Sequence, residues 1–420
     1  MQYFEKEFSA LSNSSKEPQA IQKLRQKAFN RFREIGLPKK NWEAWRFTNF
    51  NNLVKHSFRL SSNIDLPLDR STIDGDLSMP TLVFLNGNYQ PKLSPQLEGL
   101  EIKPVLDNYT EDKNLSINGL ETEPNPFIVL NTAMMNSGLH LHFSQNFQNN
   151  SPIRFLYITT ELSEPIMNHP RLLIDLDDNV EATIIEEYRG NCSEAYLNNA
   201  LTIFCCGQNS SLEHVRIQNE GMSAYHLSST YYNAPQDCSI KANYLSKGSL
   251  LHRHDVKATL SNRGADITVN GLCLEKNRQH MDHNIIMDHA SQHVTSRMLF
   301  KYILTDKSSG VFNGRAVVRE DAQKIDANQT NNNLILSNEA LMNSNPQLEI
   351  YADDVRCTHG STTGQLNEEA LFYIKSRGLD TIAAKALLIN GFGGEALNEI
   401  KNDQLRQYSR ELLEIWLGGI

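Results

Sequence analysis

The residues best suited to chemistry lie close together near the C-terminus. Residues 353–360 read Asp-Asp-Val-Arg-Cys-Thr-His-Gly, which places two carboxylates, a thiol and an imidazole within seven positions. If residues 349–359 are extended, side chains alternate between faces and Asp353, Cys357 and His359 share one side. Cys357 and His359 would then stand about 7 Å apart along the strand. This spacing is close enough for one soft metal or a cluster, completed by a ligand from a partner; the alternative is a buried thiol beside a turn histidine.

A second group of possible metal ligands lies upstream. It consists of His280, His283, His289 and His293, with Asp282 and Asp288 between them. Two histidines three positions apart could bind zinc or iron on a helix. The segment has a strand pattern, however, which would point His280 and His283 to opposite faces. Turn and corner histidines are therefore the competing interpretation of this group. His252 and His254 do share a strand face, but they lack a third ligand nearby in sequence.

The composition limits the kind of protein. The chain has 420 residues, enough for two or three domains, and a net charge of −9 without a basic block. That balance argues against nucleic acid and anionic membranes as partners. No apolar run is long enough to cross a bilayer, and the first residues lack the basic-then-apolar order of a signal peptide. Six cysteines are scattered without a Cys-x-x-Cys pair, which fits a reduced cytoplasm.

The first part of the chain predicts one clear helix followed by a mixed stretch. An apolar stripe recurs at helical spacing in Ile21, Leu24, Ala28, Phe32 and Ile35. Pro18 suits the first turn of this helix and Gly36 suits its end. Residues 81–85, Thr-Leu-Val-Phe-Leu, predict a strand that is followed by an Asn-Gly turn.

From about residue 139 to 360, short β-type segments recur at intervals of about 10 to 15 residues without an amphipathic helix between them. They are Ala182–Tyr188, Leu201–Cys206, Leu212–Gln218, Ser239–Leu245, Ala265–Leu274, Arg297–Leu304 and Leu348–Ala352. Such a run makes a sandwich, a barrel or a stacked solenoid. Seven asparagines between 326 and 345 favour the solenoid, because amides at the corners of successive coils can stack; ordinary turn asparagines are the alternative. We therefore predict a parallel β-helix.

The last part of the chain has a helical period. Asn367 and Asp380 are placed to cap two helices, the second of which is expected to end at Gly391. A third helix carries one apolar face, made of Leu405, Tyr408, Leu412, Ile415 and Trp416. These helices would either cover the last coil or bind a partner. The chain thus divides into a helical and mixed region (1–135), a β-helix core (136–365) and a helical domain (366–420).

No complete catalytic apparatus is evident. Residues 391–394, Gly-Phe-Gly-Gly, lack the Lys-Ser/Thr of a phosphate-binding loop and are interpreted as a hinge or cap. A Gly-x-Ser-x-Gly elbow is missing as well. The sequence therefore predicts a protein that is not an enzyme.

Several ordered motifs resemble those of the SufB/SufD family of iron–sulfur cluster assembly scaffolds. They are Trp45-Arg-Phe-Thr48, His280-Met-Asp-His283, Val311-Phe-Asn-Gly-Arg315, Asp326-Ala-Asn-Gln329, Asn333-Leu-Ile-Leu-Ser337, Asn345-Pro-Gln-Leu-Glu-Ile350, Asp353–Gly360 and Phe372-Tyr-Ile-Lys-Ser-Arg-Gly378. Within the family the chain is most similar to the SufD type. It lacks an N-terminal cysteine cluster, since its first cysteine is Cys192, and it has the Asp-Asp-Val-basic-Cys-x-His-Gly run before the helical domain.

This resemblance implies a right-handed parallel β-helix between an N-terminal helical region and a small C-terminal helical domain. It implies a cytoplasmic complex with a SufB-like paralogue and two copies of the SufC ATPase. Cys357 and His359 would lie at the SufB interface, where a nascent cluster assembles. His359 would act as a ligand or proton carrier, and Cys357 as a second ligand or a structural thiol.

The resemblance further implies that the C-terminal helices, at about 368–395, dock SufC. The residues expected in that contact are Phe372, Tyr373, Arg377, Leu387, Leu388 and Phe392. The cluster would be transient, the complex could bind a flavin, and the isolated chain could form a homodimer. Without the resemblance, two other functions fit: a β-helix enzyme acting on acidic polysaccharide through Asp353, Asp354 and Arg356, or an iron metallochaperone using the histidines of 280–293.

Overall fold

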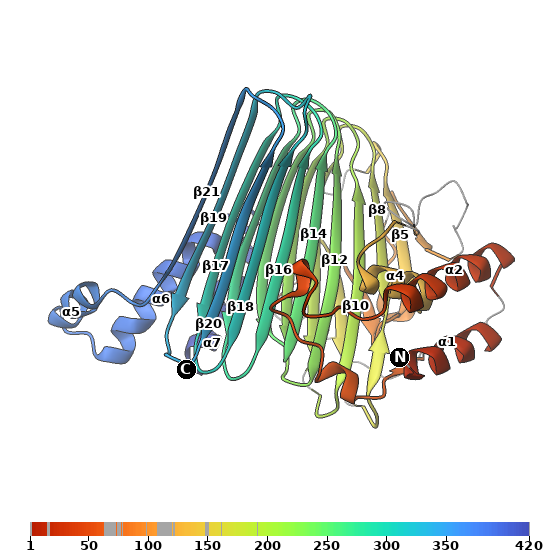
Figure 1. The fold of residues 1–420 in the computed structure, drawn as a ribbon, viewed down its shortest axis with the longest axis horizontal. Helices are drawn as coiled ribbons and strands as arrows, with labels where there is room; N and C mark the ends of the chain where they lie inside the picture. Colours follow the sequence, from red (N-terminus) through yellow and green to blue (C-terminus); the bar gives the residue numbers. More distant parts are fainter. Residues whose placement is uncertain are drawn as a thin grey trace.

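The computed structural model describes residues 2–14, 17–62, 73, 77, 79–97, 99–106, 120, 122–147, 151–160, 162–190 and 192–419. Within these residues the chain forms a parallel β-helix, with helices from the N-terminal part on one side and helices from the C-terminal part on another (Figure 1). The prediction of a mainly β fold with a β-helix core and helices before and after it is confirmed. No described helix is both long and apolar enough to cross a membrane.

Two sheets form the walls of the solenoid, and the chain passes from one sheet to the other at each corner. Sheet A contains β1 (Arg59–Leu60), β4 (Leu100–Pro104), β5 (Ser137–Phe143), β7 (Ile166–Asn168), β8 (Pro170–Leu176), β10 (Tyr196–Cys205), β12 (Ala224–Ala234), β14 (Leu251–Leu260), β16 (His280–His289), β18 (Ser309–Val318) and β20 (Leu341–Ile350). Sheet B contains β2 (Thr81–Leu85), β3 (Asn88–Tyr89), β6 (Ile153–Thr159), β9 (Glu181–Gly190), β11 (Ser211–Glu220), β13 (Ser239–Gly248), β15 (Asp266–Glu275), β17 (Thr295–Leu304), β19 (Ile325–Ile335) and β21 (Val355–Gly364).

Successive strands of one sheet are parallel and one coil apart. Ser211 pairs with Ser239 and Asp266 pairs with Thr295, offsets of 28 and 29 residues. Parallel pairing over such offsets requires a complete crossover between the strands, which here is a strand of the opposite sheet with its two corners. The seven predicted strands are therefore all present. Because each coil contains one strand from each sheet, the length of a coil is about twice the predicted interval between strands.

Stacked amides do occur at the corners, although not at the predicted asparagines. Asn179 and Asn209 occupy the same corner in successive coils with left-handed φ of 63° and 54°, and the Asn209 amide donates to Asn179 Oδ1 at 2.8 Å. Asparagine tolerates this backbone conformation better than most residues. Of the seven asparagines between 326 and 345, four lie within β19 and two within β20, so the prediction that they form a corner stack is wrong.

The N-terminal helices cover part of the outer face of sheet A. Helix α2 (Gln19–Ile35) confirms the predicted helix, since Pro18 precedes it and Gly36 ends it with φ 70°. Helices α1 (Gln2–Ser14) and α4 (Pro126–Met134) were not predicted. Every described residue of α4 is buried, because α4 lies between α2 and strands β10 and β12.

Three helices follow the last strand, α5 (Glu368–Ser376), α6 (Thr381–Leu397) and α7 (Asp403–Leu417), and the caps at Asn367 and Asp380 are as predicted. Helices α6 and α7 pack along the outer face of sheet B instead of covering the last coil. Helix α6 runs through residues 391–394, so the expected end at Gly391 and the interpretation of this segment as a hinge or cap are wrong. Gly393 and Gly394 are buried, and a Cβ on Gly393 would lie 3.1 Å from Leu413 of α7 and 3.4 Å from Leu272 of sheet B, so glycine lets α6 pack closely there. Ile415 of the predicted apolar face is exposed.

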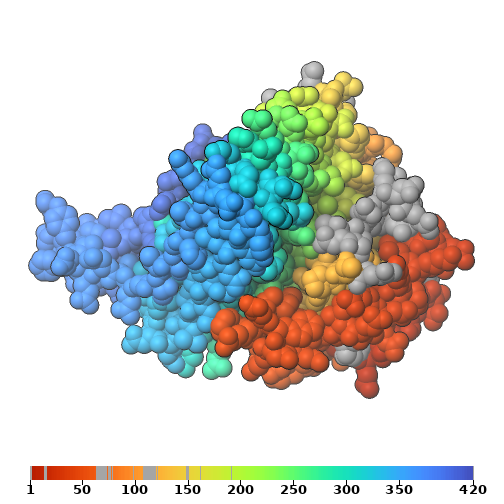
Figure 2. All heavy atoms as spheres, turned by 45° about the horizontal axis from the view of Figure 1, so that its top comes forward, coloured from red at the N-terminus to blue at the C-terminus, as the bar shows by residue number. Residues whose placement is uncertain are grey.

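Two polar contacts, one partly and one fully buried, hold α6 and α7 against the sheet. Lys301 of β17 forms an ion pair with Glu395 and donates to the Phe392 carbonyl at 3.0 Å. Tyr408 of α7 donates to Glu187 of β9 at 2.7 Å. Helix α5 and the start of α6 lie beyond these contacts and project from the body of the molecule (Figure 2).

Candidate functional site

The Cys-x-His pair lies on the last strand of the solenoid. Strand β20 ends at Ile350, residues 351–354 form a corner, and β21 begins at Val355. Cys357 and His359 are therefore extended, as predicted, and share one face of the strand. The predicted place of Asp353 on the same strand face is wrong. Asp353 lies in the corner, where the chain turns from β20 to β21 and is not yet part of the strand.

The register between β19 and β21 shows that the strand face of Cys357 and His359 points into the solenoid. On β19 the odd-numbered residues are buried and line the interior, and Ala327 pairs with Cys357 while Gln329 pairs with His359. Paired residues of parallel strands project to the same side. The Ser361 hydroxyl also lies 2.7 Å from that of Ser344 on the opposite wall. Cys357 and His359 therefore face the interior at its last coil.

This coil is open. Among the described strands, β20 pairs only with β18 and β21 pairs only with β19, so each has one unpaired edge (Figure 1). Cys357 is half-buried against the core, whereas His359 is exposed although it faces inward. Leu341, Ile350 and Tyr351 are exposed at the same end. We call β20, β21 and the corner between them the open end.

The surroundings of Cys357 keep its thiol protonated. Partial burial raises the pKa of Cys357, and the nearby Asp326 carboxylate raises it further. A thiolate is the form that binds metal, so a metal must displace this proton. A thiol and an imidazole about 7 Å apart along a strand can each supply one soft ligand, but they do not complete a coordination sphere.

The acidic and basic residues beside this pair point elsewhere. Asp353 and Asp354 lie in the exposed corner, where Asp354 pairs with Lys324. Arg356 is exposed and alternates with Cys357, so it projects to the outside of the solenoid. These three residues, the expected apparatus of a polysaccharide enzyme, do not converge with Cys357 and His359.

The upstream histidines are dispersed. His280 faces outward and contacts Thr48 and Ser309, whereas His283 faces inward and contacts the Tyr302 hydroxyl at 2.9 Å. His289 contacts Ser296, and His293 occupies a corner with φ 56°. In the described part of the chain, no three His, Cys, Asp or Glu side chains are placed to hold a metal ion. The opposite orientation of His280 and His283 confirms the strand interpretation.

Instead, the fold gathers other histidines inside the solenoid. His252 and His254 share the inward face of β14, as expected, and His283 approaches them from the next coil with ring centroids 5.6 and 5.8 Å away. All three are fully buried. Burial lowers the pKa of His283 to about 3 and that of His252 and His254 well below the ordinary value. These rings are neutral core side chains.

Acid should therefore destabilise the fold. Unfolded histidines take up protons below about pH 6.5, whereas these rings stay neutral when folded, so the free energy of unfolding falls as the pH drops. The expected loss is up to about 1.4 kcal/mol per pH unit for each ring. Urea unfolding at several pH values between about 7.5 and 5 measures this slope. His252→Gln should flatten it; an equal slope in the variant would contradict the assignment.

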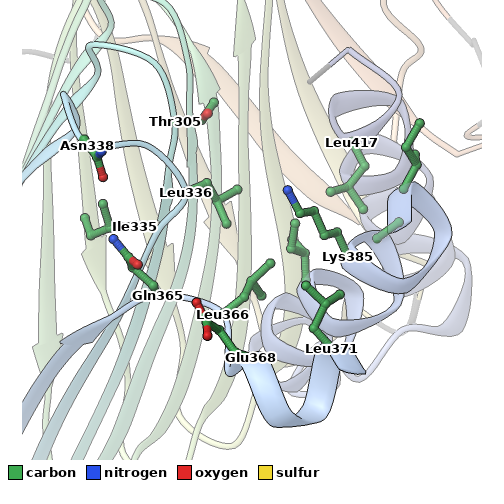
Figure 3. A pocket seen from close by; sticks show the side chains of 13 residues that line it. Thr305, Ile335, Leu336, Asn338, Gln365, Leu366, Glu368, Leu371, Lys385 and Leu417 are labelled. Carbon is green, nitrogen blue, oxygen red and sulfur yellow. The ribbon is translucent and has the colours of Figure 1, made fainter. Parts of the chain in front are cut away.

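The C-terminal residues expected to contact a partner differ in exposure. Phe372, Tyr373 and Leu387 are 76%, 58% and 53% exposed, and Arg377 donates to the Tyr373 hydroxyl at 2.9 Å. Leu388 and Phe392 are half-buried, and Phe392 packs its ring on Lys301. A groove of about 510 Å³ separates α5 and α6 from the end of β19, lined mainly by apolar side chains together with Lys385 and Glu368 (Figure 3).

Comparison with known proteins identifies the family. The family model described as SUF system FeS cluster assembly, SufBD core domain, matches residues 157–392, and the SufBD protein N-terminal region matches residues 1–155. The chain belongs to the SufBD family of iron–sulfur cluster assembly proteins. A SufBD family protein of Synechocystis is 30% identical over 94% of this chain and 92% of its own length. The iron–sulfur cluster assembly proteins SufD of Escherichia coli and Bacillus subtilis are 28% and 24% identical and are also covered over 91% and 96% of their lengths.

Residues 45–48 hold the N-terminal segment against sheet A. The Trp45 ring lies 3.6 Å from the Arg253 guanidinium, and Arg253 pairs with Asp282 while donating to the Ala44 carbonyl at 2.8 Å. Thr48 also donates to Asp282. Sequence reasoning did not single out Arg253; the available signal was an arginine between two histidines on a strand with buried neighbours.

Residues 311–315 of β18 shape the interior of the solenoid one coil before the open end. A Cβ on Gly314 would lie 2.7 Å from the Phe312 ring and 2.9 Å from Gln329 Oε1. Glycine therefore makes room for the Gln329 side chain, which lies beside His359 in register. The motifs at 311–315, 326–329 and 353–360 thus meet at one end of the molecule, although up to 49 residues separate them in sequence.

Proposed function

We propose that this chain is a non-catalytic scaffold subunit that assembles nascent iron–sulfur clusters together with a SufB-like partner. The observation that carries the proposal is the position of Cys357 and His359, two soft ligands on the inward face of the last strand at an open end. The similarity to proteins named SufD supports it. In this arrangement the incomplete coordination sphere is completed by the partner.

The ligand types fit iron in a cluster. Iron–sulfur clusters are held mainly by cysteine thiolates, and histidine replaces cysteine in some of them. Since the pKa of Cys357 is raised, His359 is the side chain more readily available to a first iron ion. In the alternative role, an imidazole that is not bound to iron accepts the proton that Cys357 releases. The cluster is cargo that leaves the site, so a weak two-ligand contribution suits the role.

The partner would extend the solenoid. Unpaired edges of β20 and β21 offer backbone donors and acceptors to another pair of strands, and Leu341, Ile350 and Tyr351 provide apolar contact around them. A SufB-like subunit stacked there would cover Cys357 and His359. A second copy of this chain could occupy the same edge when the partner is missing.

A SufC-like ATPase would bind the projecting helices. Phe372, Tyr373 and Leu387 are large and exposed, and they lie on helices that the body of the molecule leaves largely uncovered (Figure 2). Exposed apolar clusters of this kind mark protein interaction sites. Because Phe392 and Lys301 tie α6 to sheet B, a force applied to α5 and α6 would reach the solenoid wall directly.

The open-end interface can be tested with a charge. Leu341→Asp places a carboxylate on an exposed position of β20, where desolvation on partner binding would cost several kcal/mol without affecting the isolated fold. We expect the variant to lose the complex with the co-expressed SufB-like subunit, measured by size exclusion with light scattering. Met222→Asp, on an exposed turn before β12, is the matched control and should bind normally. If both variants bind the partner equally well, the open end is not the interface.

A further inference from the structure

A pocket unrelated to the open end lies where the N-terminal segment crosses the beginnings of β16 and β18. It encloses about 490 Å³. Lys55, at the end of a short 3-10 turn (Leu53–Lys55), and Arg278, in the corner between β15 and β16, both line it. Both cationic side chains are exposed, and no acidic residue is among the described residues that line the pocket. The pocket is therefore a positively charged hollow in a chain of net charge −9.

Its polar groups are arranged as donors. The Asn49 side-chain oxygen accepts from the Asn51 backbone at 2.8 Å, and the Asn52 oxygen accepts from Lys55 at 3.0 Å. The side-chain oxygens of Asn49 and Asn52 are thus engaged, which leaves the N–H₂ groups of these two residues to donate to a ligand. His280 forms part of the lining but has both ring nitrogens occupied, by Ser309 at 2.7 Å and Thr48 at 3.0 Å. Two cations and two amide donors without a carboxylate suit an anion.

An aromatic wall adds a second feature. Phe47 lines the pocket with 44% of its surface exposed, and the buried Tyr225 lines it from sheet A. The volume is larger than one phosphate group requires, and an exposed phenyl ring offers a stacking surface for a flat ring. Charge and shape together describe a compound with a phosphate at one end and an aromatic ring at the other.

We propose that this pocket binds a phosphate-bearing small molecule of nucleotide size. Lys55 and Arg278 pair with the phosphate, Arg278 by its planar fork and Lys55 as a point charge. Asn49 and Asn52 donate to the same oxygens, and Phe47 stacks on the ring. The site is separate from Cys357 and His359, so it stands whether or not they bind a cluster.

Calorimetric titration of the full chain with ADP and with inorganic pyrophosphate, at low and moderate salt, tests the site. We expect saturable binding of both, weakened at least tenfold in the double variant Lys55→Gln/Arg278→Gln. Phe47→Ala should weaken ADP but leave pyrophosphate unchanged. The double variant Lys39→Gln/Arg263→Gln, which removes two exposed cations outside the pocket, is the matched control.

Three results would overturn the proposal. The first is that neither ligand binds at millimolar concentration. The second is that the control variant weakens binding as much as the pocket variant, which would indicate a general attraction of anions. The third is that Phe47→Ala weakens both ligands equally, which would rule out the aromatic contact. Thermal melting of each variant checks that the fold is intact. All the substituted side chains are at least partly exposed, so unchanged melting is expected.

Discussion

Replacing His359 by alanine should abolish most of the cluster bound by the assembled complex while leaving the complex intact. His359 is exposed at the open end and makes no contact that the fold requires, so its loss should not weaken the chain. Its imidazole is one of two soft ligands that this chain offers there. We expect iron and acid-labile sulfide to fall at least tenfold in the anaerobically co-purified complex with SufB-like and SufC-like subunits, with an unchanged size-exclusion profile.

Two further variants sharpen this test. Arg356→Ala lies three residues away on the opposite face of the same strand, so it should retain the cluster. Cys357→Ser should lose the cluster if the thiolate is a ligand, and retain it if the thiol only packs against the core. Unchanged iron and sulfide in His359→Ala would show that β21 is structural and that the partner holds the cluster alone.

Replacing Arg253 by methionine should have the largest effect on stability. The Arg253 and Asp282 side chains are each about 1% exposed, and they pair with one another. Removing the guanidinium leaves a buried carboxylate without its cation, which typically costs about 3–5 kcal/mol. The Trp45 ring loses its cation as well, and the N-terminal segment loses the hydrogen bond to the Ala44 carbonyl. We expect a lower urea midpoint and faster proteolysis of residues 40–60.

A surface pair provides the matched control. Lys307 forms an ion pair with Glu339 at 2.7 Å, and the two side chains are 54% and 64% exposed. Exposed pairs contribute about 0–1 kcal/mol, so Lys307→Met should shift the midpoint only slightly. If both variants lose the same stability, the Arg253 contacts do not hold the N-terminal segment to sheet A.

Local signals predicted the helices well. A cap acts on an amide two or three residues away, so Asn367 and Asp380 could be recognised without knowing the fold. The end of α6 could not be predicted in the same way. Gly391 normally signals a helix end, but packing of Gly393 and Gly394 against sheet B and α7 stabilises the helix as far as Leu397.

Strands with polar interiors were the main omission. Strands β12, β18 and β19 were not among the predicted strands, and β12 and β19 turn histidine, asparagine or glutamine inward. The expected alternation of apolar and polar residues is weak there. Their inward side chains are satisfied by residues of other strands and coils, as when His254 contacts Thr230 and Asn333 contacts Thr363. A window of ten residues cannot contain both members of such pairs.

By itself the sequence determined the helix caps, the recurrence of strands, and the shared face of Cys357 and His359, because each depends on neighbours within a few residues. Only the tertiary structure decided that this face looks into an open coil, that His283 joins His252 and His254, and that α6 and α7 lie along sheet B. These outcomes depend on parallel pairing about one coil apart and on contacts as distant as Glu187 with Tyr408. Such contacts form only when the whole solenoid is assembled, so no local pattern records them.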